Sequence, residues 1–277
     1  MSVIRVSGLR KSYGANEAVH GIDFEISAGE VFGLLGPNGA GKTTTIEILE
    51  GYRDRSGGEV EVLGIDPQHA GRAWRERLGV VLQSSSLYPN LTVRESLRTF
   101  GGYYTHSRNV NEVVELIGLG EKADARVRTL SGGQKRRLDL GLALIGDPEL
   151  IFLDEPTTGF DPGARRTAWE TIRNLRSLGK TILLTTHYLD EAEQLADRVA
   201  VLRAGEIIRE GSPSELTGAS AETEIRFRRN GTAVVERTKE PTQRLHELIH
   251  EAGGAELEEL EVRRPTLEDV YLELTGE

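Results

Sequence analysis

Between about residues 131 and 202, short apolar runs alternate with longer segments whose apolar residues recur at helical spacing. A helix is expected from Ser131 to about Ile145, and the apolar strand Leu150–Leu153 follows after a Gly-Asp-Pro turn. Uninterrupted apolar strands that alternate with helices indicate a parallel sheet covered on both faces. The alternation continues with the helix Pro162–Leu178, the strand Thr181–Thr185, the helix Leu189–Ala196 and the strand Val199–Leu202.

The N-terminal part of the chain is richer in strand patterns, and the region after it is mostly helical in its spacing. Strands are expected at Val3–Val6, Ala18–Ile26, Val31–Leu35, Gly58–Leu63 and Gly79–Gln83, and helices at Lys42–Leu49, Thr92–Tyr104 and Val110–Ile117.

A change of composition at Ser212–Ala221, where Gly, Ser, Pro and Thr gather, predicts a linker. The segments beyond it predict a small α+β appendage. We therefore expect two domains, one over residues 1–215 with a helical subdomain at about 85–145, and an accessory domain over 220–277. The segments of the appendage are Glu224–Phe227, Thr232–Arg237, Thr242–Ala252, Leu257–Val262 and Leu267–Leu274.

Composition narrows the class of protein. Apolar residues make up 38% and charged residues 28% of the chain, which is typical of a globular protein. The net charge of −10 argues against broad binding to nucleic acid, because neutralising phosphates needs a surplus of Lys and Arg. With no cysteine, disulfides, thiolate catalysis and sulfur-ligated metals are excluded.

No apolar run approaches the roughly 18 residues that cross a bilayer, and the N-terminus does not resemble a signal peptide, so a cytoplasmic location is expected.

A glycine-rich loop between the expected strand Val31–Leu35 and the following helix fits the pattern G-x-x-x-x-G-K-[ST]. Glycines allow the main chain to wrap around phosphates, Lys42 reaches the β and γ oxygens, and Thr43 offers a hydroxyl to Mg²⁺. The loop alone indicates a nucleoside triphosphate and leaves kinase, GTPase and motor open. The residues expected to contact the nucleotide are Gly36, Pro37, Asn38, Gly39, Ala40, Gly41, Lys42, Thr43 and Thr44.

Two consecutive acids end the apolar strand Leu150–Leu153. A strand of this kind delivers its last side chains to the carboxyl edge of the sheet, where the ligands of such folds bind. Asp154 is placed to hold a metal ion, directly or through water. Glu155 is the natural general base, because it can accept a proton from an attacking water.

The pentapeptide Leu130 to Gln134, Leu-Ser-Gly-Gly-Gln, precedes an expected helix. Ser131 can cap that helix, and the N–H groups of Gly132 and Gly133 can form a second anion site. Here the chain resembles the ABC ATPases, whose signature is this pentapeptide. Two separate phosphate-binding loops in one chain favour a composite nucleotide site that uses a loop of each kind. Gln134 is also assigned to this site.

Other segments follow the motif order of the same family over roughly residues 3–211. Gln83 matches the glutamine loop, residues 158–161 match the D-loop, and His187 matches the switch histidine that follows an apolar strand. Tyr13 matches the early aromatic that stacks on adenine, although packing on the sheet is an open alternative. The order of these motifs makes the resemblance far more specific than any one of them.

Two residues of the D-loop depart from the family pattern: Thr158 replaces the more usual serine and Phe160 the more usual leucine, while Asp161 is intact. Both replacements keep the chemical character, so they are expected to tune dimer packing. The basic run Lys135 to Arg137 is interpreted as a solvated helix face and not as a nucleic-acid site.

The resemblance implies the fold, an α/β P-loop cassette with a mostly parallel core sheet, an antiparallel β part and a helical subdomain. It also implies an ATPase that uses Mg²⁺, with Glu155, His187, Lys42 and Gln83 as catalytic residues. Thr43, Gln83 and Asp154 are expected to hold the metal, and Asp161 joins the nucleotide-binding residues.

In the family, two cassettes pair head to tail and sandwich ATP between the loop of one and the signature of the other. The resemblance therefore implies a homodimer that lies on the cytoplasmic face of the membrane through a separate permease. The segment Gln83–Leu97 is the surface that would grip a short helix of that permease.

The tail Pro265 to Gly276 looks like the ending of drug-resistance-type exporters, with Tyr271 where phenylalanine is usual. This favours export over import and leaves the cargo open among drug, lipid, polysaccharide and peptide. The alternative is a non-transport ABC ATPase that acts on a soluble complex, although the insertions typical of DNA-repair members and the second cassette of translation factors are absent. A regulatory module that holds ATP without turnover is disfavoured, because the catalytic residues are all present.

Overall fold

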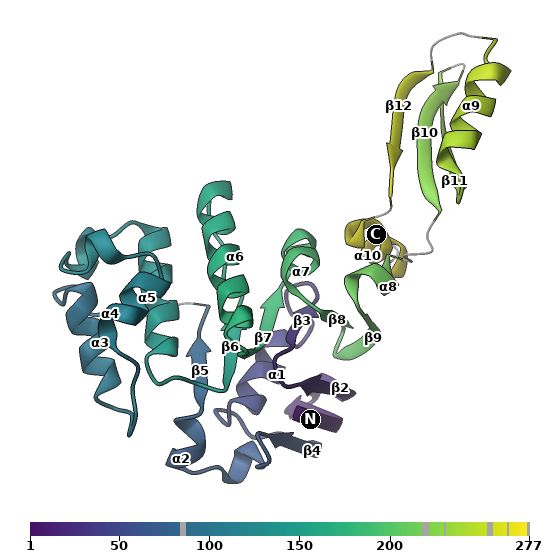
Figure 1. Cartoon of the computed structure of the whole chain (residues 1–277). Helices are drawn as coiled ribbons and strands as arrows, with labels where there is room; N and C mark the ends of the chain where they lie inside the picture. The colour runs from purple at the N-terminus through teal and green to yellow at the C-terminus, as the bar shows by residue number, and fades with distance from the viewer. Residues whose placement is uncertain (84–86, 218–221, 230, 254–256, 265, 276–277) are drawn as a thin grey trace. The chain divides into compact units, whose positions relative to one another are not determined.

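The structure is a computed structural model, and it describes residues 1–83, 87–217, 222–229, 231–253, 257–264 and 266–275. The chain divides into two compact units, Met1–Glu210 and Gly211–Glu277 (Figure 1). The first unit ends five residues before the end of the predicted 1–215 domain. In the described part of the chain, no helix is both long enough and apolar enough to cross a membrane.

The first unit is built on a sheet of strand order β5-β6-β7-β3-β8-β9. Neighbouring strands from β5 to β8 are parallel, as the apolar runs predict. The turn between β8 and β9 consists of Ala204 and Gly205, both at positive φ, which is the geometry of a tight hairpin. The strands are β3 (Val31–Leu35), β5 (Leu78–Val81), β6 (Leu150–Asp154), β7 (Thr181–Thr186), β8 (Arg198–Arg203) and β9 (Glu206–Gly211).

Successive residues of the buried strands serve two different cores. On β6, Leu150 and Phe152 belong to the cluster on one face of the sheet, whereas Ile151 and Leu153 belong to the cluster on the other face. All four side chains are fully buried. The period of two along a strand explains the division, and apolar residues at every position are what a sheet covered on both faces requires.

An antiparallel sheet of order β2-β1-β4 covers one face of the parallel sheet. The rings of Phe24 on β2 and Phe32 on β3 stack with centroids 5.5 Å apart, which joins the two sheets. Helix α1 (Lys42–Leu49) and the short α2 (Arg72–Arg75), with its buried Trp74, complete this core. The antiparallel strands are β1 (Ser2–Tyr13), β2 (Asn16–Ser27) and β4 (Gly57–Val62).

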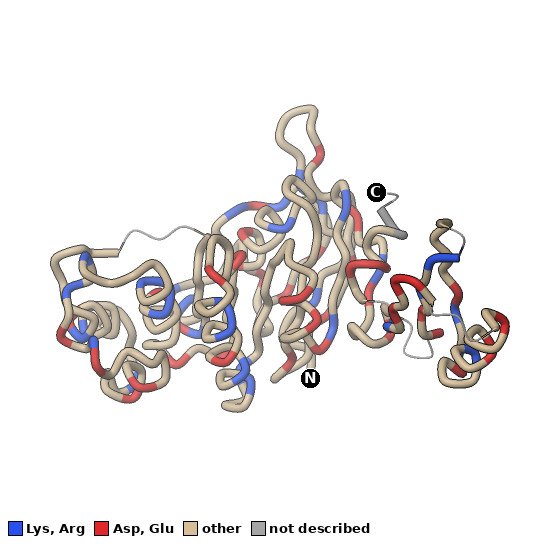
Figure 2. Tube along the Cα trace, turned by 90° about the horizontal axis from the view of Figure 1, so that it is seen from above, with Lys and Arg blue, Asp and Glu red and all other residues tan. Residues whose placement is uncertain are grey.

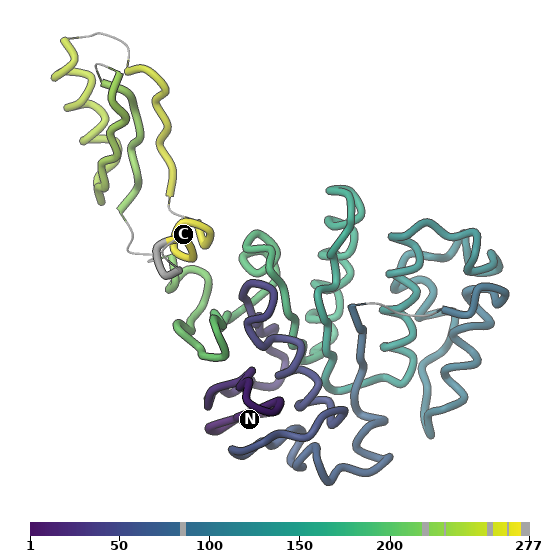
Figure 3. The backbone as a smooth tube through the Cα atoms, turned by 180° about the vertical axis from the view of Figure 1, so that it is seen from behind, coloured from purple at the N-terminus to yellow at the C-terminus, as the bar shows by residue number. Residues whose placement is uncertain are grey.

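Helices cover the other face, and α3, α4 and α5 gather at the end of the sheet next to β5 (Figure 3). These three helices form the predicted helical region. Thr92 and Glu95 form a capping box that starts α3, and Asn109 caps α4. The helices are α3 (Val93–Gly101), α4 (Val110–Leu116), α5 (Gly132–Leu144), α6 (Pro162–Ser177) and α7 (Leu189–Leu195).

The second unit has its own small core, in which Ile225, Phe227 and Leu248 are buried between a sheet and α9. The sheet has the order β11-β10-β12 and is antiparallel. Lys and Arg are interspersed with Asp and Glu along both units (Figure 2). The elements are α8 (Pro213–Leu216), β10 (Thr223–Arg229), β11 (Thr232–Thr238), α9 (Pro241–Glu251), β12 (Glu258–Arg263) and α10 (Leu267–Thr275).

The structure corrects several expectations. Part of the predicted linker Ser212–Ala221 is the helix α8, because Ser212 and Glu215 form a capping box around Pro213; residues 218–221 lie outside the described residues. Strands β1 and β2 are 12 residues long, and α2 and β9 were not expected. Pro265 and Gly276 of the terminal motif, and residues 84–86 of the predicted permease surface, also lie outside the described residues.

We predict that Phe152→Ala lowers the free energy of unfolding by about 3–5 kcal/mol, because it leaves a cavity between the sheets. Val80, its partner on β5, is 37% exposed, so Val80→Ala serves as the control and lowers stability by less than about 1 kcal/mol. Both tryptophans, Trp74 and Trp169, lie in the first unit, so denaturation followed by fluorescence reports this unit. Equal effects of the two substitutions would contradict the assignment of Phe152 to the core.

Candidate active site

The glycine-rich loop lies between β3 and α1, and it packs too closely for side chains at two positions. A Cβ on Gly36 would lie 2.2 Å from the carbonyl oxygen of Leu202, and one on Gly41, whose φ is +106°, would lie 2.6 Å from that of Ala18. Gly41 is also the N-cap of α1, so the loop leads directly into a helix N-terminus. This is a main-chain cradle of the kind that surrounds phosphates.

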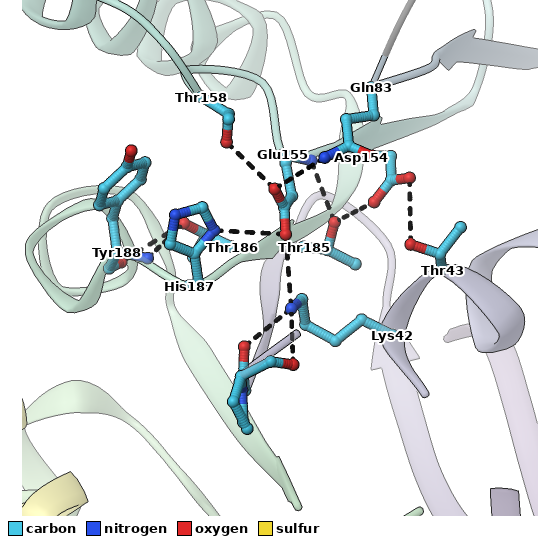
Figure 4. Close-up of polar contacts among 12 residues, drawn as sticks. Lys42, Thr43, Gln83, Asp154, Glu155, Thr158, Thr185, Thr186, His187 and Tyr188 are labelled. Carbon is cyan, nitrogen blue, oxygen red and sulfur yellow. Dashed lines mark hydrogen bonds and ion pairs between the residues drawn. The ribbon is translucent and has the colours of Figure 1, made fainter. Parts of the chain in front are cut away.

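Lys42, the first residue of α1, is buried at the base of this loop. Its Nζ donates to the carbonyl oxygens of Gly36 at 2.7 Å and Pro37 at 3.2 Å, and lies 3.4 Å from Oε1 of Glu155. The ammonium group therefore stands between the loop and the end of β6 (Figure 4).

Asp154, the last residue of β6, is buried and held by two hydroxyl groups. Thr185 on β7 donates to its Oδ1 at 2.5 Å, and Thr43 on α1 donates to its Oδ2 at 3.4 Å. Thr185 Oγ1 also accepts the main-chain N–H of Glu155 at 3.0 Å. One threonine of the neighbouring strand thus positions both acids.

Glu155 lies at the centre of the site (Figure 4). Its Oε1 is 3.3 Å from Nδ1 of His187, and its Oε2 accepts from Gln83 at 3.2 Å and from Thr158 at 3.1 Å. Its φ of 46° is in the left-handed region, which is uncommon for a residue other than glycine. Strained main chain of this kind persists only where the surroundings hold it, and it concentrates at functional sites.

Burial and the neighbouring charges shift the pKa values of Glu155 and Lys42 in this cluster. Burial alone would raise the pKa of Glu155, but the charge of Lys42 and the contacts with His187 and Thr158 outweigh it and hold that pKa below its ordinary value. Burial lowers the pKa of Lys42, and the attraction of Glu155 and Asp154 opposes only part of that shift. Glu155 is therefore a carboxylate near neutral pH.

The donor set fits Mg²⁺. The hydroxyl of Thr43 and the carboxylate of Asp154 are hard oxygen donors at the helix N-terminus and the strand end. Within the described ranges, no cluster of three or more His, Cys, Asp or Glu side chains could hold a metal ion by itself. This composition suits an ion that takes its other ligands from phosphate and water.

The signature residues line a pocket of 540 Å³. Gly132, Gly133 and Gln134 are among its lining residues, and so is Asp161 of the D-loop. Ser131 caps α5 and forms a capping box with Gln134. Asp161 caps α6 by accepting the N–H groups of residues 163 and 164, both at 2.9 Å. Of the residues around Glu155, Gln83 and Thr158 also line this pocket.

Tyr13 ends β1 and is 42% exposed. The Nζ of Lys11 is 5.1 Å and the Cζ of Arg53 is 5.3 Å from the ring centroid. The ring therefore lies against two cations and presents part of its surface to solvent.

The structure brings Lys42, Thr43, Gln83, Asp154, Glu155 and His187 into one cluster, whereas Tyr13 and the residues 131–134 and 161 lie outside it.

Sequence reasoning missed two residues of this region. Thr185 gave only the weak signal of a hydroxyl next to the strand end. The expectation that Arg136 lies on a solvated helix face is wrong: its side chain is half-buried and donates to the carbonyl oxygens of Asp154 and Pro156, both at 3.1 Å. Only the tertiary structure brings α5 to the end of β6.

A separate groove of 290 Å³ lies where the end of α1 meets β5, α3 and α5, and Phe100 and Tyr104 are among its lining residues. Glu50 and Arg75 also line it. Oε1 of Glu50 is buried and has no hydrogen-bond partner among the residues that the structure describes. Burial, with a smaller contribution from the charges of Asp154 and Glu47, raises the pKa of Glu50 to about 8.

Comparisons with a family model and with known proteins agree on one family. The family model described as ABC transporter matches residues 19–158. The Nod factor export ATP-binding protein I of Rhizobium meliloti (strain 1021) is 43% identical over 298 residues, which cover 99% of this chain and 88% of that protein.

Solved structures agree with the sequence comparison. An ATP-binding subunit of an ABC transporter matches with a TM-score of 0.73 and 24% identity, covering 99% of both chains. A dimeric ATP-binding cassette in a post-hydrolysis state, bound to ADP and Pi, matches with a TM-score of 0.67 and 25% identity, covering 76% of this chain and 98% of its own. The fold class expected from the sequence is confirmed.

The raised pKa of Glu50 predicts a pH dependence of stability. Between pH 4.5 and about 8 the unfolded chain loses this proton while the folded chain keeps it, so the free energy of unfolding falls as pH rises through that window. Glu50→Gln removes this contribution, and the variant should lose less stability than the parent between pH 5 and pH 8. Urea titrations at both pH values measure it, with the exposed Glu112→Gln as a control that should follow the parent. Parallel curves for the Glu50→Gln variant and the parent would contradict the assignment.

Proposed function

This chain belongs to the ABC transporter family and is an ATP-hydrolysing subunit of an exporter, and we propose that it works as a head-to-tail homodimer on a separate membrane-spanning permease. One observation carries the proposal: within one chain, Lys42 and Glu155 do not line the pocket of the signature residues 131–134, although Gln83 and Thr158, which contact Glu155, border it. Two copies in opposite orientation would bring the cluster of each onto the signature of the other.

The roles we propose within the cluster follow from its geometry. The glycine-rich loop binds the phosphates, and Lys42 neutralises charge on the β and γ oxygens. Thr43, Asp154 and Gln83 would hold Mg²⁺, which when bound supplies further neutralisation of the phosphate charge.

Glu155 is the general base of the proposed reaction. Its depressed pKa keeps it ionised, so that it can accept a proton from the attacking water. His187 and Gln83, which contact its two oxygens, orient the γ-phosphate and the water. Positioning and charge stabilisation are sufficient for phosphoryl transfer, and no covalent intermediate is needed.

The signature side of the partner completes the site. Ser131 and the N–H groups of Gly132 and Gly133 lie at the N-terminus of α5, where the helix dipole favours an anion. ATP bound between the two surfaces then stabilises the closed dimer, and the dimer raises nucleotide affinity by the same factor. Tyr13 stacks on the adenine, and Asp161 positions the loop between the subunits.

We propose that the groove beside Glu50 and the adjoining Tyr88 receive a cytoplasmic segment of the permease. Tyr88 is 56% exposed, and its ring packs against Phe100 of the groove at 6.3 Å between centroids. Docking of that segment would hold the subunit at the cytoplasmic face of the membrane. The relatives are named for Nod factor export, which makes that cargo the first candidate to test.

For the catalytic roles, we predict that Glu155→Gln lowers the rate of ATP hydrolysis by about 100-fold or more, since general bases contribute on that scale. ATP affinity is retained, and the variant accumulates as an ATP-bound dimer. Phosphate release and light scattering with and without ATP measure the two effects. Glu149→Gln, just before β6 and at the surface, is the matched control. A Glu155→Gln variant that hydrolyses ATP at the parent rate would remove Glu155 from the role of base.

For the permease, we predict that tagged Glu155→Gln protein, purified from detergent-solubilised membranes of its host with ATP present, brings a polytopic membrane protein with it. Mass spectrometry identifies what is recovered. Recovery of soluble proteins alone would favour the non-transport alternative and leave the nucleotide chemistry intact.

The docking surface is tested by adding Tyr88→Ala to the same protein. Recovery of the membrane protein should fall several-fold, while ATP-dependent dimerisation is unchanged. Leu178→Ala, which removes an exposed apolar side chain outside the groove, should leave recovery at the level of the parent. Undiminished recovery with Tyr88→Ala would exclude a docking role for this residue.

A further inference from the structure

Arg136 connects three segments of the first unit that are far apart in the sequence. It lies on α5, five residues after the signature Ser131. Its guanidinium group donates to the carbonyl oxygen of Leu82, at the end of β5, and to that of Asp154, at the end of β6. It also donates to the carbonyl oxygens of Pro156 at 3.1 Å and Glu155 at 3.5 Å.

These carbonyl groups adjoin two residues of the proposed catalytic site. Leu82 immediately precedes Gln83, and Gln83 donates to the side chain of Glu155. One arginine therefore holds the main chain on both sides of the contact between Gln83 and Glu155. The planar guanidinium, with five donors in a fixed fork, is suited to bind several carbonyl groups at once.

The segments that Arg136 holds need support. Leu82 is 51% exposed, and Glu155 has a main-chain conformation that residues other than glycine rarely adopt. Hydrogen bonds from a charged donor are roughly twice as strong as those between neutral groups. Arg136 can therefore hold Leu82, at the exposed end of β5, and Glu155, whose main chain is strained, at fixed positions relative to each other.

We propose that Arg136 is a positioning residue that sets the contact between Gln83 and Glu155 according to the position of the signature helix α5. A shift of α5, when Ser131 engages the nucleotide of the partner cassette, would then reach the general base in its own chain. This inference rests on the proposed function, since it assigns a use to the composite site.

The neighbouring Arg137 provides a matched comparison. It lies on the same helix and also donates to a carbonyl oxygen, that of Gly118, at 2.8 Å. Gly118 lies between α4 and α5 and is not a part of the catalytic cluster. Arg137→Gln therefore removes the same charge and a similar hydrogen bond while leaving the hydrogen bonds of Arg136 to Leu82 and Asp154 in place.

The test compares Arg136→Gln, Arg136→Lys and Arg137→Gln in steady-state ATP hydrolysis. Arg136→Gln should lower kcat by about tenfold or more and change KM for ATP by less than about threefold. The variant still binds the nucleotide, but its general base, Glu155, is poorly positioned. Arg136→Lys, which keeps the charge without the fork, should recover part of kcat. Arg137→Gln, which leaves the carbonyl contacts of Arg136 intact, should lower kcat much less than Arg136→Gln does.

A double-mutant cycle separates positioning from simple structural support. If Arg136 acts through Gln83, then combining Arg136→Gln with Gln83→Ala should lower kcat no further than the more damaging single change does. Effects on kcat that multiply, or an Arg136→Gln variant that is less stable but keeps the parent kcat, would overturn the proposal. Should Arg136→Gln fail to fold, the same cycle with Arg136→Lys decides the question.

A separate measurement tells failure of this inference from failure of the proposed function. Glu155→Gln combined with Arg136→Gln should still form the ATP-bound dimer, because residues 131–133 make the proposed signature contacts and the guanidinium of Arg136 binds carbonyl oxygens of its own chain. Loss of the dimer in Glu155→Gln alone would count against the composite site, and with it against transmission from the partner. A dimer that forms normally, together with multiplying effects on kcat, would count against Arg136 alone.

Discussion

Two consecutive acids buried at the end of one strand are the constraint around which the first unit is organised. A buried carboxylate is tolerated only when donors surround it. Asp154 and Glu155 draw those donors from every neighbouring element: Lys42 and Thr43 from α1, Thr185 from β7, and others from the loops after β5, β6 and β7. The parallel order of the sheet matters because it brings all these strand ends to one edge.

Patterns that are local in the sequence predicted the fold well. The apolar runs located β3, β6, β7 and β8, since a strand buried on both faces carries a continuous signal. Strand β9 was missed because its residues are mostly polar and partly exposed, and only its position at the edge of the sheet makes it a strand. Helix α8 was hidden by residues typical of linkers, although a capping box starts it.

The candidate site was predictable to the extent that its residues lie in motifs. Lys42, Thr43, Gln83, Asp154, Glu155 and His187 come together in the structure as the order of motifs suggested. What the sequence could not convey is how these residues are held. Thr185 and Arg136 act through contacts between segments distant in the chain, and their residue types carry no signal of such a contact before the fold is known.

The contacts of Arg136 have a consequence for how this region can vary in evolution. Its partners are main-chain oxygens, which every residue possesses, so substitutions at 82 and 154–156 change side chains without removing an acceptor. The contact therefore places no demand on which side chains stand at its partner positions, and no covarying partner would reveal it in a family of sequences. Genetic suppressors of a substitution at 136 would have to restore the geometry of the loops themselves, and not a lost pair of side chains.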